Sequence, residues 1–333
     1  MCLSEAKGMD IIMKKKFLAV TLSALMAVSL AACSGGQVET TAAETTAAAA
    51  ESAESAESSE AAETEAGAES AEAESAAAAV ETVTEGKLTV ATSPDFAPYE
   101  FYAIGEDGTP TLAGFDMALA QYIADYMGLE LEVITVDFDG VLSELQTKSV
   151  DLGMAGLSPD PKRENIMNFS DIYYTGGQSL VTVKANAETY NSFEAINKPD
   201  VSVGAQTGSI QLDLANTNSP DADIISLPKV TDIIAELLAG KLDAAYIETV
   251  VAESYQKNYP DLEIVMDVPY DVAGSAIGVS KDNDALLAAV NEAIAAAIED
   301  GSMDAFVAEA NELASGQTYE GLLDAEGNVQ TQE

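Results

Sequence analysis

Histidine and tryptophan are missing from this sequence of 333 residues, and cysteine occurs only at Cys2 and Cys33. Without histidine the chain lacks the side chain that most often serves as a general base near neutral pH and as a nitrogen ligand for metals. Because both cysteines lie near the N-terminus, the rest of the chain has no disulfide, no thiolate nucleophile and no Cys/His zinc site. We therefore predict no metal and no cofactor.

Basic residues are also scarce, with 14 Lys and Arg against 57 Asp and Glu, which gives a formal net charge of -43. A chain this acidic repels phosphate backbones, so we exclude nucleic-acid binding as its function. Hydrophobic residues nevertheless make up 47% of the chain, and its length suffices for two domains of ordinary size. The excess of acidic residues affects the solubility of the protein and its choice of partners but does not determine its fold. The fold has to be inferred from the spacing of apolar residues along the chain.

The N-terminal region has a lysine cluster at 14–16, an apolar run over 17–32 and then Cys33. This order is typical of a secretory signal peptide, and the run is shorter than the roughly 20 apolar residues of a membrane-spanning helix. The sequence LAAC at 30–33 resembles the bacterial lipobox, which implies cleavage before Cys33 and acylation of that cysteine. A plain signal peptide is the alternative. We predict a signal peptide over 1–32, with translation starting at Met13.

Residues 33–86 combine the acylated cysteine with a segment made almost entirely of Ala, Glu, Ser and Thr. Such a segment has few large apolar side chains, so burial cannot offset the entropy cost of ordering it. Repulsion between glutamates also keeps it extended. We predict a disordered acidic tether here and an acidic tail at 316–333.

From Lys87 onward, short β-rich runs alternate with segments of helical periodicity. In one of these segments Leu119, Ile123 and Met127 share a face, and Asp116 lies near its start. The alternation predicts an α/β fold with parallel sheets covered by helices, in which ligands bind at the carboxyl ends of strands. Strands are expected at 87–92, 131–136, 201–205, 224–227 and 243–247, and helices at 116–127, 140–147, 231–238, 284–299 and 303–313, with two more starting at 208 and 249.

Seven short motifs follow one another in this region. They are ATSPDFAPYEF (91–101), GFDMALA (114–120), VDFDGVL (136–142), DLGMAGLS (151–158), NFSDIYY (168–174), GAQTGS (204–209) and GKLDAAYIE (240–248). Together with Arg163, they resemble the polar amino-acid-binding proteins of ABC importers, which are the bacterial extracellular solute-binding proteins of family 3. The resemblance covers residues 87 to about 314. One motif would be weak evidence, whereas seven in order are specific.

The resemblance implies a two-lobed periplasmic-binding-protein fold of type II. In this fold the ligand cleft lies between lobes that are joined by two crossing strands, which we expect near 181–185 and 276–280. Lobe one would then span 87–181 and 280–315. Lobe two would span 182–279 and include the hinge strands.

Arg163 is the only arginine in the chain. A guanidinium binds a carboxylate through two parallel hydrogen bonds, so Arg163 is a candidate for holding the carboxylate of an amino acid. A solvated arginine in a charged run is the alternative. The resemblance adds Ala155, Gly156 and Ser158 as contacts for the carboxylate and ammonium of the ligand, although Ser158 could instead cap the next turn.

Three residues of the second lobe are also implicated by the resemblance. Thr207 and Gly208 would offer backbone N–H groups to the carboxylate at the start of a helix, and an ordinary turn is the alternative. Glu248 stands where the family usually carries an Asp that holds the ligand's ammonium. It keeps the charge and adds one methylene of reach. A solvated carboxylate at a helix start is the alternative.

Phe96 and Phe138 match family aromatics that enclose the side chain of the ligand, although aromatic residues often belong simply to the core. Ser93 stands where many relatives carry an Asp that helps to hold an ammonium or a basic side chain. Gly204 and Ile247 stand where glutamine binders carry Lys and His. The site thus has one cation and one anion, both used by the ligand's backbone, and burying a further charge would be costly. We expect a neutral or polar uncharged amino acid.

These observations predict a monomeric, lipid-anchored protein on the extracytoplasmic face of the membrane that delivers an amino acid to the permease subunits of an ABC importer. A secreted dehydratase-like enzyme on the same fold is the alternative, because such enzymes resemble the family and use a carboxylate as acid or base. No His or Cys could assist there, and Glu248 serves better as an ammonium partner, so we expect no catalysis. A ligand-sensing module is a third possibility, but no signalling domain or later apolar span follows.

Overall fold

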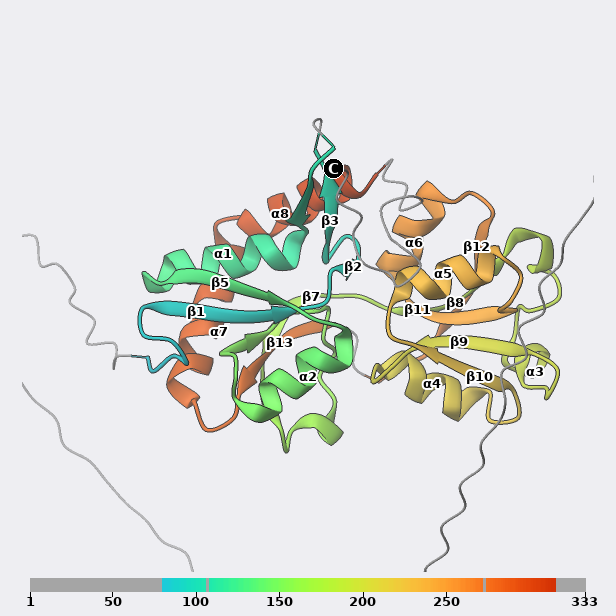
Figure 1. Cartoon of the computed structure of the whole chain (residues 1–333), viewed down its shortest axis with the longest axis horizontal. Helices are drawn as coiled ribbons and strands as arrows, with labels where there is room; N and C mark the ends of the chain where they lie inside the picture. Colours follow the sequence, from blue (N-terminus) through green and yellow to red (C-terminus); the bar gives the residue numbers. More distant parts are fainter. Residues whose placement is uncertain (1–79, 106–107, 272–273, 316–333) are drawn as a thin grey trace, which may run out of the picture. The chain divides into compact units, whose positions relative to one another are not determined.

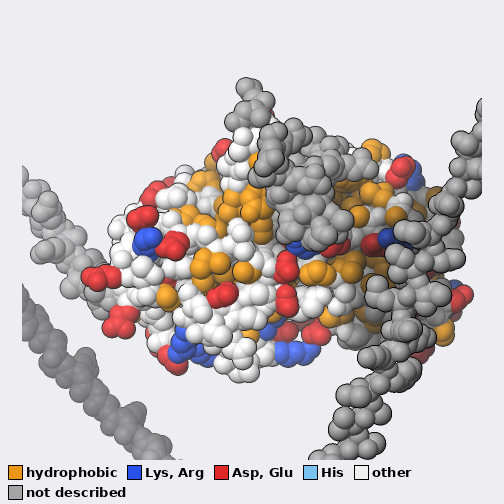
Figure 2. Space-filling model, viewed as in Figure 1, with side chains coloured by type: hydrophobic (Ala, Val, Ile, Leu, Met, Phe, Trp, Pro, Cys, Tyr) orange, Lys and Arg blue, Asp and Glu red, His pale blue; other side chains and the backbone are white. Residues whose placement is uncertain are grey.

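The computed structural model describes residues 80–105, 108–271 and 274–315, which form two five-stranded sheets and a smaller three-stranded sheet (Figure 1). The predicted signal peptide, Cys33, the tether as far as residue 79 and the C-terminal tail lie outside these residues. The end of the predicted tether, at 80–86, is ordered rather than disordered, because the backbone N–H of Val83 donates to Oδ1 of Asp151 at 2.8 Å and Val80 packs against the core. In the described part, the helices are too short or too polar to cross a membrane. The face drawn in Figure 2 carries acidic side chains over much of its extent, with basic side chains between them.

The first lobe is built on a sheet with the strand order β5-β1-β6-β13-β7. Strand β1 runs parallel to β5 and β6, and Lys87 lies opposite Glu130. Helices α1 and α7 lie on one face of the sheet and α2 on the other, while α8 packs against α1 and α7 (Figure 1). The elements are β1 (Lys87–Thr92), β5 (Glu130–Thr135), β6 (Leu152–Gly153), β7 (Met167–Tyr174), β13 (Ser275–Ser280), α1 (Phe115–Met127), α2 (Phe138–Thr147), α7 (Asp284–Glu299) and α8 (Ser302–Ala314).

Alternation of side chains along β1 explains these layers. Leu88 and Val90 point to one face and join the core that contains residues of α1 and α7. Ala91 points to the other face and joins a core with Phe138 and Leu145 of α2. Since every side chain of a central strand meets a helix on one face or the other, β1 is buried along most of its length.

The second lobe repeats this plan on a sheet with the order β10-β9-β11-β8-β12. Along β11, Ala244 and Tyr246 pack on the side of α4, whereas Ala245 and Ile247 pack on the side of α5 and α6 (Figure 1). The elements are β8 (Gln178–Val183), β9 (Ser202–Gln206), β10 (Asp223–Leu227), β11 (Ala244–Glu248), β12 (Leu262–Val268), α3 (Phe193–Ile196), α4 (Ile210–Asn218), α5 (Val230–Leu238) and α6 (Thr249–Asn258).

The chain passes from the first sheet to the second at 175–177, and it returns between the end of β12 at Val268 and the start of β13 at Ser275. The strand that follows each passage, β8 or β13, is antiparallel to both of its neighbours. The expected parallel pairing holds for β1 with β5 and β6 and for β9 with β10 and β11, whereas β8 and β13 make both sheets mixed. The expected lobe boundaries at 181/182 and 279/280 fall inside β8 and β13, so the passages lie several residues earlier than the sequence suggested.

A third sheet, β2-β3-β4, follows β1 and leads into α1. It consists of β2 (Asp95–Phe96), β3 (Glu100–Ile104) and β4 (Pro110–Ala113). Gly114 makes the close approach between this sheet and α1, since a Cβ there would lie 2.0 Å from the carbonyl oxygen of Tyr99. Its φ of 120° also requires glycine.

Candidate functional site

Arg163 closes a 3-10 turn, Pro161–Arg163, that lies between β6 and β7 in the first lobe. Its side chain is only 8% exposed, and its Nη2 donates a hydrogen bond to the carbonyl oxygen of Gly208 at 2.9 Å. The guanidinium carbon lies 5.7 Å from the centre of the Phe138 ring, within the range of a cation–π contact. The guanidinium is thus held between an aromatic ring of the first lobe and a backbone carbonyl of the second.

The electrostatics of Arg163 are set by burial. Desolvation lowers the pKa of the guanidinium, and the nearby Asp160, Tyr270 and Asp213 partly counteract this. An arginine nevertheless remains charged in a protein. No carboxylate of the described residues forms an ion pair with Arg163. A planar fork of donors in this environment is suited to a carboxylate, which it can bind through two hydrogen bonds.

The loop after β9 brings Gly208 to Arg163. Gly208 has a φ of 76°, and its carbonyl accepts the bond from the guanidinium. Helix α4 begins at Ile210, and Ser209 is its N-cap. The expected helix start at Gly208 is therefore two residues too early. The contact between Gly208 and Arg163 was not predicted, and it uses the carbonyl of Gly208 rather than the N–H that was expected to bind the carboxylate of the ligand.

Thr207 is bonded within its own lobe. Its backbone N–H donates to the carbonyl oxygen of Leu227 at 2.8 Å. Its hydroxyl lies 2.9 Å from the hydroxyl of Ser226. The N–H that was expected to reach a carboxylate is already used to pair the ends of β9 and β10.

The loop at 155–158, named here the Gly156 loop, joins the two predicted aromatics. Gly156 has a φ of 55°, and a Cβ at this position would lie 2.7 Å from Cε1 of Phe96, so the close contact requires glycine. Ala155 belongs to the same core as Phe138. The backbone N–H of Gly156 donates to Oδ2 of Asp116 at 3.1 Å, which fixes the loop to the start of α1.

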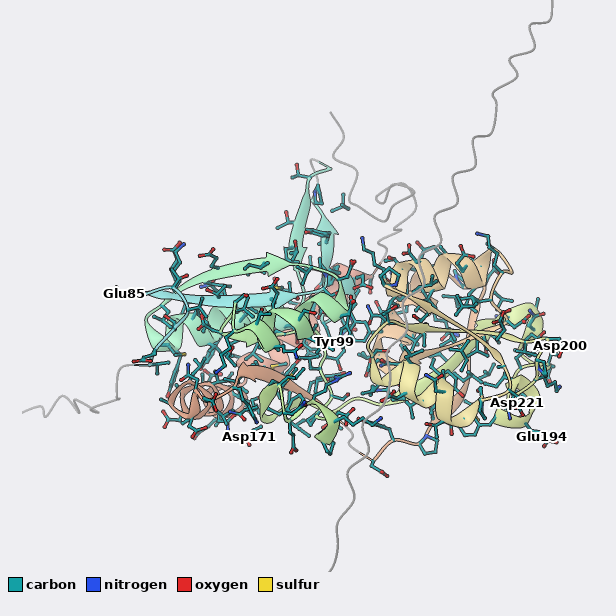
Figure 3. All side chains as sticks on the ribbon, turned by 60° about the horizontal axis from the view of Figure 1, so that its bottom comes forward. Glu85, Tyr99, Asp171, Glu194, Asp200 and Asp221 are labelled. Atoms are coloured by element: carbon teal, nitrogen blue, oxygen red, sulfur yellow. The ribbon has the colours of Figure 1, made fainter. Side chains whose placement is uncertain are left out.

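Glu248 is the last residue of β11 and the N-cap of α6. Its Oε2 accepts a hydrogen bond from the backbone N–H of Val251 at 3.0 Å. Its Oε1 accepts from the backbone N–H of Gly177 at 3.3 Å and, more weakly, from the hydroxyl of Tyr99 at 3.5 Å (Tyr99 is labelled in Figure 3). The side chain lies at a helix start, but at 3% exposure it is buried rather than solvated.

Burial makes Glu248 a poor anion on its own. Desolvation raises the pKa of its carboxyl to about 7, and the bonds from Val251, Gly177 and Tyr99 lower it by less. None of the described basic residues forms an ion pair with Glu248. A cation placed beside this carboxyl would stabilise its ionised form and offset the cost of burial.

Glu248 is also connected to both passages between the lobes. Gly177, which donates to its Oε1, precedes β8 at the end of the first passage. The Tyr99 hydroxyl, its other partner, lies 3.0 Å from the hydroxyl of Ser275, which opens β13 after the second passage. A change in the charge or contacts of Glu248 therefore acts directly on the segments that join the lobes.

Ser93 does not stand alone, because its hydroxyl donates to Oδ1 of Asp95 at 2.7 Å. Oδ2 of Asp95 accepts bonds from Nε2 of Gln206 and from the backbone N–H of Val230, both in the second lobe. Desolvation raises the pKa of the Asp95 carboxyl to about 6. Asp95 could not be singled out from the sequence, since an aspartate next to a proline gives no sign of being buried against a distant helix.

The predicted residues fall into three local groups. Arg163 lies with Phe138 and Gly208, Phe96 lies against Gly156, and Glu248 lies at the passages. Ser93, Ala155 and Ser158 are buried as well, whereas Thr207 is half-buried at the edge. Within the described ranges, no group of three or more Cys, Asp and Glu side chains is arranged to hold a metal ion.

Residues 88–309 match the family model of the bacterial extracellular solute-binding proteins, family 3. The chain belongs to this family. The arginine-binding extracellular protein ArtP of Bacillus subtilis is 35% identical over 202 residues, which are 60% of this chain and 76% of ArtP. The cyclohexadienyl dehydratase of Pseudomonas aeruginosa is 27% identical over 198 residues, which are 59% of this chain and 72% of that enzyme.

A solved structure extends this likeness to three dimensions. The amino acid ABC transporter substrate-binding protein AbpA of Streptococcus pneumoniae, bound to L-arginine, matches with a TM-score of 0.67 and 34% identity. The match covers 70% of this chain and 97% of AbpA. The predicted family and the two-lobed periplasmic-binding-protein fold are thus confirmed, and the family implies a location outside the cytoplasm.

Proposed function

We propose that this family 3 protein binds a free α-amino acid between its lobes and delivers it to an ABC importer. The observation that carries the proposal is a pair of buried groups of opposite charge, Arg163 in the first lobe and Glu248 in the second. Neither has a counter-ion among the described residues. An amino acid carries one carboxylate and one ammonium, so it complements both. The names of ArtP and AbpA support an amino-acid ligand.

We assign the carboxylate of the amino-acid ligand to Arg163 and to the Gly156 loop. The guanidinium already uses Nη2 for Gly208, and its remaining N–H groups are suited to a two-bond contact with a carboxylate. The Phe138 ring against the guanidinium restricts its orientation. Ser158, in the same loop as Gly156, adds a hydroxyl to this end of the ligand.

The ammonium end is assigned to Glu248. A carboxyl that burial holds at a pKa of about 7 gains more from an adjacent cation than an exposed carboxyl would. Its helix-cap bond to Val251 uses Oε2, whereas Oε1 accepts only the longer bonds from Gly177 at 3.3 Å and Tyr99 at 3.5 Å, so we assign the ammonium group to Oε1.

For the ligand's side chain we propose a neutral or polar uncharged group next to Phe96 and Phe138. Asp95, which adjoins Phe96, accepts hydrogen bonds from three groups of the protein, and burial disfavours its charge, so a cationic side chain is not the first candidate. Arginine is the second candidate. It is favoured by the arginine named for ArtP and AbpA, and by the burial of Asp95 close to Phe96.

Binding rather than catalysis is proposed in spite of the dehydratase relative. The chain has no histidine, and its two cysteines precede the folded part, so a carboxylate would have to act without such a partner. Glu248 is held as a helix cap and is better suited to binding an ammonium group. We further propose a monomer that is anchored to the membrane by a lipid on Cys33.

A thermal-shift screen of the twenty amino acids, followed by calorimetric titration, tests the proposal, since a ligand that binds only the folded state raises its stability. We expect one or a few amino acids to raise the melting temperature. Glutamine and arginine in the same screen separate the uncharged from the cationic ligand. The absence of any shift, or turnover of a cyclohexadienyl substrate at the rate of the dehydratase, would refute the proposal.

A further inference from the structure

Glu100, the first residue of β3, is a carboxyl group without a hydrogen-bond donor. Its side chain is 0% exposed, and in the described structure neither of its oxygens has a hydrogen-bond partner. It lies opposite Phe96 in the pairing of β2 with β3. The carboxyl of Asp116 interacts with it, and the backbone N–H of Asp116 donates to the carbonyl oxygen of Tyr99, the residue before Glu100, at 2.9 Å. An ionised, buried carboxylate with no donor would be very unfavourable at this position.

Asp116, in the first turn of α1, is by contrast well supplied with donors. Its Oδ1 accepts from the Tyr173 hydroxyl at 2.6 Å, and its Oδ2 accepts from the backbone N–H of Gly156 at 3.1 Å. A position in the first turn of a helix also favours negative charge. The two neighbouring carboxyls therefore differ sharply in their ability to carry a charge.

Two buried carboxyls that lie together with no other donor between them repel each other if both are ionised. A proton held between them removes this repulsion. We propose that Glu100 and Asp116 share one proton, with the negative charge on Asp116, and that this pair positions the Gly156 loop for the ligand. Glu100 donates, and Asp116 then accepts from three groups at once. Because the bond to Gly156 depends on a negative Asp116, the pair acts as a positioning element behind the binding site.

The surroundings of Glu100 support this assignment of charge. Burial raises the pKa of the Glu100 carboxyl well above its usual value, and the charges of Asp116 and Asp95 raise it further. Tyr173 faces the pair from β7, and Tyr99 faces Asp116 from the loop before β3, both as neutral phenols whose pKa values are raised by burial. Burial raises the pKa of Asp116 only to about 6, because the hydrogen bonds from Tyr173 and Gly156 lower it.

The consequence for the site rests on the proposed function. Gly156 is in the left-handed region, with Phe96 against its Cα, so a small rotation of its peptide moves the N–H and the ring together. Loss of the Asp116 bond would free this peptide. The neighbouring Ala155 and Ser158 would then lose the orientation in which they flank the ligand.

Replacement of Glu100 by glutamine tests whether Glu100 is protonated, because an amide has the shape of the neutral acid and can donate a hydrogen bond to Asp116. An acid whose pKa is raised by folding stabilises the fold fully below its unfolded pKa and less as the pH rises above it. We therefore expect Glu100→Gln to melt at the temperature of the parent near pH 4 and at a higher temperature at pH 8. The exposed Glu299→Gln is the control and should show no such difference.

Infrared spectroscopy detects the protonated carboxyl of Glu100 directly, and the measurement needs no ligand. At pH 9, above the pKa values of Glu248 and Asp95, the parent protein should show a protonated-carboxyl band that is lost in Glu100→Gln and kept in Glu299→Gln. An unchanged band, or a Glu100→Gln variant that is less stable than the parent at pH 8 or fails to fold, overturns the shared proton. These two measurements stay decisive even if no amino acid binds.

The positioning role has its own measurement. Asp116→Asn keeps an oxygen for one donor but loses the charge, so affinity for the ligand should fall about tenfold or more, while Glu100→Gln should stay within about threefold of the parent. Tyr173→Phe removes the other bond to Asp116 and leaves Gly156 in place, so it serves as the matched control. Parent-like affinity in Asp116→Asn overturns the positioning role.

Discussion

Nε2 of Gln206 in β9 donates a hydrogen bond to Oδ2 of Asp95 in β2 at 3.2 Å, so an amide of the second lobe is joined to an acid of the first. The backbone N–H of Val230, the first residue of α5, donates to the same oxygen, and the hydroxyl of Tyr255 donates to the backbone carbonyl of Asp95 at 3.1 Å. Asp95 thus bonds to three elements of the second lobe. A buried aspartate at the N-terminus of a helix is favourable for both partners.

Replacement of Gln206 by glutamate should weaken this contact between the lobes. Two carboxylates would then face each other in a buried place, at a cost of about 1–3 kcal/mol from the lost donor alone. We expect a larger radius of gyration in ligand-free solution scattering and a lower melting temperature at pH 8, with both effects smaller at pH 5, where a proton can be shared.

Lys162→Met is the control for the Gln206 variant. Lys162 also bridges the lobes, through an ion pair with Asp213 at 2.6 Å, but both side chains are exposed. Exposed ion pairs contribute little, so this variant should scatter and melt as the parent does. Equal effects of the two variants would mean that burial of Asp95 is not what holds the lobes together.

The regular elements could largely be predicted from the sequence. The strand expected at 87–92 and the helix expected at 284–299 have those bounds in the structure. Most other expected elements begin or end within two residues of the observed bounds. These elements can be predicted because their signal lies within the segment itself. Apolar residues that recur at the helical period, or that form a run between two turns, indicate which side chains are buried.

The third sheet and the lobe boundaries could not be predicted in this way. Strands β2 to β4 are short and pair with one another, so they show no long apolar run. Strand β8 does show an apolar run, but a buried run does not say to which sheet it belongs. Its position between β11 and β12 depends on partners more than sixty residues further along the chain.

The same distinction holds for the site. Arg163 and Glu248 could be named as candidates because Arg163 is the only arginine, Glu248 ends a recognisable motif, and each carries a charge that needs a partner. Asp95 and Glu100 stand in one of those motifs too, yet their roles depend on Val230 and Asp116, which are distant in sequence. Residues that act through tertiary contacts of this kind leave no local pattern.

Loss of the guanidinium should abolish most of the binding. Arg163→Ala removes one half of a buried charge pair with the ligand's carboxylate, which should cost on the order of 2–5 kcal/mol of affinity. Arg163→Lys keeps a charge without the planar fork and should recover only part of this loss. Calorimetric titration against the ligand found in the screen measures both. Near-parental affinity in Arg163→Ala would exclude Arg163 from the site.

Cys33→Ser tests the lipid anchor, which lies outside the described residues. If Cys33 is acylated after cleavage of the signal peptide, the serine variant should move from the membrane fraction to the soluble extracytoplasmic fraction. Its affinity for the ligand, measured on the purified protein, should match that of the parent. Unchanged membrane fractionation of the variant would contradict acylation at this residue.

The last prediction concerns pH and Glu248. Its folded pKa of about 7 lies above the ordinary value of 4.5, so its contribution to ligand-free stability is full below pH 4.5 and is lost as the pH rises through about 7. Binding has the opposite dependence, because an ammonium group requires the ionised carboxylate. Affinity should therefore rise by up to about tenfold per unit of pH below 7 and level off above it.

Glu248→Gln should flatten this profile. The amide keeps an acceptor for the ammonium group and for the cap of α6, so affinity at pH 8 should fall by less than in Arg163→Ala. At pH 5, where the parent carboxyl is mostly protonated, the variant and the parent should bind almost equally. An N-acetylated ligand, which has no ammonium group, should bind poorly at every pH and should not reduce the radius of gyration. A parent profile that is flat from pH 5 to 8, or a variant that keeps the parent slope, would show that the ammonium group is held elsewhere.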